Sequence, residues 1–131
     1  MKIFYYIIII FILFLLSCFN PCHNEIIEII LSPDNEFIAI AFIRDCGTAS
    51  SYSPQVYILD NSNKNRNVNY NKITGNVFRG NVSKFINIYW KDAKTLIVEH
   101  SCTEELIIES LEYYQGIKIE YIVSLDKENY R

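Results

Sequence analysis

The sequence predicts an all-β fold: a small antiparallel sheet or sandwich of about seven to eight strands, after an N-terminal signal segment. Short runs rich in Ile, Val and aromatic residues recur along the chain, and turn-forming residues separate them every ten to fifteen residues. Ten Tyr, eight Phe and one Trp supply large side chains for a small core. The first apolar run differs from the others, because its length and position are typical of a targeting segment.

Length and charge limit the functions that the chain can have. It has 131 residues, of which 18–131 carry 11 Lys and Arg against 15 Asp and Glu, a net charge of −4. A chain of this length holds one domain, which excludes a multidomain enzyme and a transporter with many membrane spans. Its mild acidity argues against a nucleic-acid partner, which would require clustered Lys and Arg.

Residues 1–17 are predicted to be a signal peptide. Lys2 precedes fourteen apolar residues, 3–16, which are short for the roughly 20 residues of a transmembrane helix and typical of a secretory signal. The sequence L-L-S-C at 15–18 then resembles the lipobox of bacterial lipoproteins, with an apolar residue three positions before Cys18 and a small residue directly before it. The resemblance implies cleavage before Cys18 and acylation of its sulfur. Two acyl chains anchor a protein stably, whereas one does so only marginally.

By this resemblance the protein belongs to the bacterial cell envelope, faces outside the cytoplasm and contacts the membrane through its lipid. Residues 18–24 would form a tether and residues 25–131 a single β-rich domain. Two alternatives stay open, namely an uncleaved membrane anchor and ordinary signal cleavage at another position.

The remaining cysteines predict one disulfide, because export places them in an oxidising compartment. We expect Cys46 to pair with Cys102, since each follows a predicted strand near a turn. Closing this loop of about 56 residues would stabilise the fold by roughly 4 kcal/mol in the chain-entropy model. Cys22 is expected to lie in the tether outside the bridge, and three reduced thiols are the alternative. No metal site or cofactor is expected, because the chain has two His and no Cys-x-x-Cys motif.

The strands are predicted in order from residue 25. Residues 25–31 and 36–44 form a hairpin around the turn Ser32-Pro33-Asp34-Asn35. Both faces of 36–44 are apolar, which favours a buried central strand. Residues 84–90 and 95–100 form a second hairpin around a turn at 91–94.

The other segments are assigned more simply. Residues 103–111 favour a strand over a short helix, and the Asn-rich segment 61–71 is predicted to be a surface loop. Residues 113–116 are predicted to be a turn. Further strands are predicted at 55–60, 75–80 and 117–125.

Two resemblances concern the body of the chain. S-P-D-N-E-F-I-A at 32–39 and I-Y-W-K-D-A-K-T-L at 88–96 resemble the hairpins of blades in periplasmic propeller proteins. Only about two blades fit in the chain, so this resemblance implies the hairpins, and a closed propeller only if several chains assemble. The longer pattern, whose most distinctive part is R-D-C-G-T-A-S-S-Y-S at 44–53, resembles a family of small exported bacterial proteins with no assigned function.

A candidate binding loop follows the predicted buried strand, where binding loops are often found. Arg44 is expected either to bind an anion or to pair with Asp45 or a strand neighbour, while Cys46 pins the loop. The loop's small and polar residues are Arg44, Asp45, Gly47, Thr48, Ser50 and Ser51.

We therefore expect a lipid-anchored, non-catalytic binding or structural module with an envelope protein as its partner, and no catalytic residue. The alternative is an envelope thiol-redox protein or hydrolase that uses Cys46 with His100. That alternative requires a reduced Cys46, because the thiolate is the reactive form. A serine hydrolase is not indicated, since the chain has no G-x-S-x-G motif. A third hypothesis is an assembly subunit whose strands complete a sheet with copies of itself.

Overall fold

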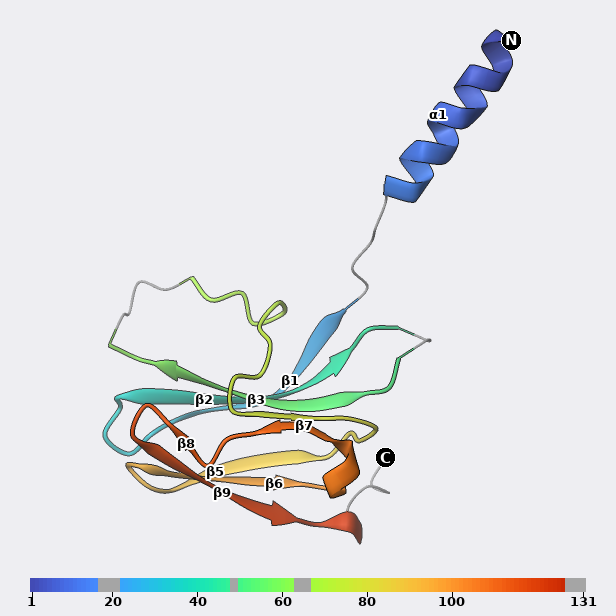
Figure 1. The fold of residues 1–131 in the computed structure, drawn as a ribbon. Coiled ribbons are helices and arrows are strands. Elements are labelled where there is room, and N and C mark those ends of the chain that lie inside the picture. The colour runs from blue at the N-terminus through green and yellow to red at the C-terminus, as the bar shows by residue number, and fades with distance from the viewer. Residues whose placement is uncertain (17–21, 48–49, 63–66, 127–131) are drawn as a thin grey trace.

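The computed structural model describes residues 1–16, 22–47, 50–62 and 67–126. One helix, α1 (Lys2–Leu16), precedes two β-sheets that pack face to face (Figure 1). Among the described residues the strands are β1 (His23–Leu31), β2 (Phe37–Asp45), β3 (Ser53–Asp60), β4 (Phe78–Gly80), β5 (Ile86–Asp92), β6 (Thr95–His100), β7 (Ile107–Ser110), β8 (Tyr113–Tyr114) and β9 (Ile117–Val123). A 3-10 helix, η1 (Glu104–Leu106), precedes β7. The predicted all-β sandwich is confirmed.

The first hairpin turns where the sequence predicts it. Ser32 Oγ accepts a hydrogen bond from the Phe37 amide at 3.0 Å and donates one to Asp34 Oδ1 at 2.6 Å. The same Asp34 oxygen accepts from the Glu36 amide at 3.1 Å. Asn35 has a φ of 59°, in the left-handed region that Asn adopts more readily than most residues. The side chains of the turn therefore fix the β1–β2 register.

β1 lies at one edge of the first sheet, which has the order β1-β2-β3-β4-β7. Its pairing with β2 passes directly from Ile26 opposite Phe42 to Glu28 opposite Ala41, so Ile27 is the extra residue of a β-bulge. On the core side of β1, Ile30 packs against the residues between the sheets.

The core lies between the two sheets and draws on alternate residues of their strands. From β2 it takes the odd-numbered side chains, as a period of two requires. The buried members are Phe37, Ala39, Ala41, Ile43, Val56, Ile58, Val77, Phe78, Ile86, Ile88, Leu96, Val98, Cys102, Ile117 and Ile119.

The opposite face of β2 is also buried, as its two apolar faces predict. Ile40 and Phe42 are fully buried although they alternate with the core residues. The segment 70–75 lies against this outer side of the sheet, where Gln55 Oε1 accepts a hydrogen bond from the Gly75 amide at 2.8 Å. A predominantly polar segment thus lies on an apolar face through hydrogen bonds between its backbone and polar side chains of the sheet.

The second sheet, of order β5-β6-β9-β8, is mixed and not purely antiparallel as predicted. β6 and β9 run parallel, from Thr95 opposite Lys118 to His100 opposite Val123. The reason is the path between them, since β7 leaves to pair with β4 in the first sheet before the chain returns. The predicted turn at 113–116 contains the two-residue strand β8, and the turn itself is limited to Gln115 and Gly116.

The N-terminal helix stands apart from the sheets in Figure 1. Its apolar side chains from Ile3 to Phe14 are exposed. Within the described part of the chain, no helix combines the length and hydropathy needed to span a membrane. Cys18, the predicted lipidation site, lies outside the described residues.

Candidate functional site

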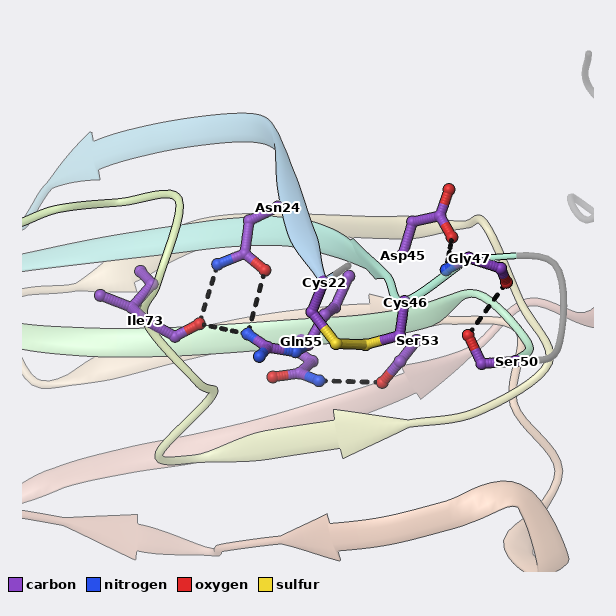
Figure 2. The surroundings of a disulfide bond; sticks show 10 residues. Cys22, Asn24, Asp45, Cys46, Gly47, Ser50, Ser53, Gln55 and Ile73 are labelled. Atoms are coloured by element: carbon purple, nitrogen blue, oxygen red, sulfur yellow. Dashed lines mark hydrogen bonds between the residues drawn. A yellow bond between two sulfur atoms is a disulfide. The ribbon is translucent and has the colours of Figure 1, made fainter. Parts of the chain in front are cut away.

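A disulfide joins Cys46 to Cys22 at the start of β1, so the predicted Cys46–Cys102 pair is wrong (Figure 2). The cause is the register of the first hairpin. His23 pairs with Asp45, and the cysteines are the next residues outward on the two antiparallel strands. Sequence reasoning missed this pair because it left Cys22 in the tether. Counting outward from the turn and adding one residue for the bulge places Cys22 opposite Cys46.

Cys102 instead lies in the core as a buried thiol, 1% exposed. Its Sγ lies 3.6 Å from the Asn81 carbonyl oxygen, which accepts its hydrogen bond. Gly80 is its close neighbour, since a Cβ built on Gly80 would overlap the Cys102 sulfur. The position of Cys102 is therefore a packing position.

Arg44 contacts a strand neighbour, which is one of the alternatives predicted for it. Its Nη1 donates to Asn24 Oδ1 at 3.3 Å and to the Ile73 carbonyl oxygen at 3.1 Å. Asn24, opposite Arg44 in the register and 5% exposed, donates through Nδ2 to the carbonyl oxygens of Tyr70 and Ile73 at 2.9 and 2.8 Å. The two side chains together hold the segment 70–73 against the start of β1 (Figure 2).

Local hydrogen bonds join Asp45, Gly47 and Ser50 of the candidate loop. Asp45 Oδ1 accepts a hydrogen bond from the Gly47 amide at 2.9 Å. The Gly47 carbonyl oxygen accepts from both the amide and the hydroxyl of Ser50, each at 3.2 Å. Gly47 has a φ of 98°, which favours glycine. Ser51 is exposed, and Thr48 lies outside the described residues.

A hollow of about 290 Å³ opens beside this turn, lined by Asp45, Gly47, Ser50 and Tyr52. The Lys84 ammonium lies 3.8 Å from the centre of the Tyr52 ring, a cation–π contact. The structure therefore brings four residues of the segment 44–53 together around a small polar surface. Arg44 is directed instead toward Asn24 and Ile73.

A larger hollow, of about 510 Å³, lies near the turn of the first hairpin and the end of β3, and sequence reasoning did not identify it. At this hairpin Lys94 forms ion pairs with Glu36 and, at 3.5 Å, with Asp34. These contacts hold the tips of the two predicted hairpins side by side. The hollow is lined by Asn35, Glu36, Phe37, Asp60, Asn61 and Ser62.

His100 is a core residue, 1% exposed. Its ring stacks on Phe78 with 4.7 Å between centroids, and its Nδ1 accepts a hydrogen bond from the Cys102 amide at 3.1 Å. Burial lowers the pKa of His100 and keeps the ring neutral. The redox or hydrolase hypothesis needs a reduced Cys46, whereas here the Cys46 sulfur is bonded to Cys22.

Among the residues that the structure describes, no group of three or more His, Cys, Asp or Glu side chains is arranged to hold a metal ion.

Comparisons with protein-family models, with curated proteins and with solved structures find no match for the chain. The resemblances to lipoproteins, to propeller hairpins and to a family of small exported proteins therefore stay predictions.

Proposed function

We propose that the chain is an exported protein, held at the membrane of a bacterial cell envelope by acyl chains on Cys18. The observation that carries the proposal is that α1 runs directly into the lipobox-like sequence L-L-S-C at 15–18. A helix that is apolar on every side is suited to a membrane and not to water, and the side chains of α1 are exposed from Ile3 to Phe14. Its 15 residues fit a cleaved signal better than a span.

The disulfide supports export as well. Cys22 and Cys46 are joined at the edge of the first sheet, and disulfides persist in secreted and periplasmic proteins while cytosolic thiols stay reduced. The bridge lies four residues after Cys18. It therefore fixes the start of the folded domain close to the proposed lipid.

We further propose that the β-domain is a non-catalytic binding or structural module with a partner in the envelope. The polar groups of Asp45 and Ser50 are engaged in local turns, and His100 is buried and neutral. These are roles in folding, not in chemistry. Loops at the ends of a sandwich are the usual binding surfaces of such domains.

Intact mass of the full chain, expressed in bacteria and extracted from membranes, tests the anchor. We expect the mass of residues 18–131 plus acyl chains, and incorporation of labelled palmitate. Cys18→Ser should abolish both, while Cys22→Ser, four residues away, should retain them. An unacylated full-length mass in the membrane fraction would show an uncleaved anchor and contradict the proposal, as would an unacylated protein released from the cell.

The non-catalytic role has a separate test. Cross-linking of the acylated chain in intact cells should recover a defined envelope protein, and substitutions around the hollow at Tyr52 or around that at Asn61 should weaken the cross-link. Hydrolase or thiol-oxidoreductase turnover that disappears in Cys46→Ser would instead establish the enzymatic alternative.

A further inference from the structure

β1 carries a row of exposed apolar side chains. Ile27, Ile29 and Leu31 are 45%, 47% and 52% exposed. Ile29 and Leu31 alternate with Ile30 and therefore point to one face of the strand, and Ile27 is the exposed extra residue of the bulge beside them. Three large aliphatic side chains in a row on an edge strand form the kind of exposed surface that marks a contact site.

The row borders an apolar surface that the protein already buries. Ile29 pairs with Ile40, which is fully buried, and Leu31 pairs with Ile38. The segment 70–75 covers part of this outer side of the sheet through its bonds to Asn24 and Gln55. The row of β1 is a part of that face that stays exposed, as is Ile108 of β7 at the opposite edge of the sheet.

The row lies on the first strand after the proposed lipid. Four residue steps separate Cys18 from Cys22, a reach of at most about 14 Å when fully extended. The bridge to Cys46 fixes Cys22, and three hydrogen bonds hold the side chain of Asn24. The start of β1 therefore stays within this distance of the acylated sulfur.

We propose that the row formed by Ile27, Ile29 and Leu31 rests on the lipid bilayer in which Cys18 is anchored. This inference depends on the proposed lipidation. The short tether and the disulfide keep the exposed apolar row close to the membrane. An apolar face at that position is stabilised when it enters the boundary between lipid headgroups and acyl chains.

The contact is apolar in character and not electrostatic. Glu25 is exposed on the same strand, and residues 18–131 carry a net charge of −4. Anionic lipids would repel such a surface. We therefore expect the contact in zwitterionic phosphatidylcholine, with little dependence on salt.

Fluorescence quenching by brominated acyl chains tests the orientation. The acylated full chain is placed in vesicles of brominated phosphatidylcholine as the variant Ile29→Trp, and the signal of the native Trp90 is subtracted using the unsubstituted chain. Tyr89→Trp is the matched control, because Tyr89 is 45% exposed and lies on the outer face of the second sheet, opposite to the core residue Ile88. We expect Trp at position 29 to lose roughly half its emission, which corresponds to insertion about 5–10 Å into the bilayer. Trp at position 89 should lose little.

The outcomes separate this inference from the proposed function. If the acylated chain floats with the vesicles but both variants are quenched equally little, the orientation is wrong and the lipid anchor stands. If the chain is not acylated and does not float, both proposals fail. Shielding of Trp at position 29 from aqueous acrylamide without quenching by lipid, together with a cross-linked dimer, would assign the row to a second copy and overturn the inference. Leu31→Trp should give the same result as Ile29→Trp. The orientation can therefore still be tested if one of the two substitutions prevents folding.

Discussion

The side-chain amide of Asn76 pairs with the backbone of Ile58 as a neighbouring strand residue would. Asn76 Oδ1 accepts from the Ile58 amide at 2.8 Å, and its Nδ2 donates to the Ile58 carbonyl oxygen at 2.8 Å. β4 pairs with β3 at Val56 opposite Phe78, and Ile58 opposite Asn76 lies two positions further along the same register. The side chain of Asn76 therefore continues the β3–β4 hydrogen-bond ladder on the N-terminal side of β4, where the backbone is not yet paired as a strand.

Asn76→Ala should lower the free energy of unfolding by about 1–3 kcal/mol, because it leaves the two backbone groups of Ile58 unpaired. Asn76→Asp should not restore the lost stability, since a carboxylate cannot donate a hydrogen bond to the Ile58 carbonyl oxygen. Urea unfolding of the full chain in mild detergent, followed by Trp90 fluorescence, measures the loss. The exposed Asn71→Ala is the control and should change stability by no more than about 0.5 kcal/mol.

Gly80→Ala should destabilise the fold by about 1–3 kcal/mol through overpacking. The added Cβ would overlap Cys102 Sγ and lie 3.2 Å from Phe78 Cζ and from Pro54 Cγ. Removing the sulfur in the double variant Gly80→Ala/Cys102→Ala should recover part of the loss. A double-variant cycle of thermal unfolding measures this coupling, and strictly additive losses would contradict the close approach.

Loss of the disulfide should cost about 3.5 kcal/mol, the chain-entropy value for a closed loop of roughly 25 residues. Cys22→Ser and Cys46→Ser should each give this loss, and so should reduction of the unsubstituted chain. Cys102→Ala should keep the bridge. Masses after alkylation with and without reductant identify the pair, and a Cys102→Ala chain without a disulfide would refute the Cys22–Cys46 assignment.

Stability should fall as the pH drops below 6.5 because of His100. Burial lowers its pKa in the folded state from the ordinary value of 6.5. The unfolded chain then binds a proton that the folded chain excludes. His100 therefore costs no stability above pH 6.5, and up to about 1.4 kcal/mol for each pH unit between 6.5 and its lowered pKa in the folded state, below which both states are protonated. Unfolding midpoints at pH 7.5 and 5.5 measure the effect. His100→Asn should flatten this dependence, whereas the exposed His23→Asn should keep it.

Local sequence predicted the parts of the fold that depend on local chemistry. Ser32, Asp34 and Asn35 identify the first turn through their own side chains, and the hydrogen bonds there are the ones such residues make. The two apolar faces of β2 predicted a strand buried on both sides. Of residues 103–111, for which the sequence favours a strand over a short helix, only Ile107–Ser110 form a strand, while Glu104–Leu106 form the 3-10 helix η1.

Features set by distant pairing could not be predicted in this way. The parallel contact of β6 with β9 depends on β7 joining the other sheet, and no residue between 101 and 116 signals that exchange. The disulfide partner of Cys46 depends on one bulge at Ile27, which shifts the register by one residue. In the candidate loop, Asp45, Gly47 and Ser50 do contact one another, but Arg44 binds Asn24 instead. Asn24 was not predicted as a partner because residues 18–24 were assigned to the tether.

The path of the chain through the second sheet also sets the order in which the molecule can be completed. β9, which follows the other strands among the described residues, lies inside that sheet between β6 and β8. A chain that emerges N-terminus first therefore leaves the inner edge of β6 open until residues 117–123 arrive. Any copy truncated before that point keeps an unpaired strand edge, which is a site for aggregation and proteolysis. Closure of the second sheet thus depends on the segment 117–123, and a molecule without that segment cannot complete it.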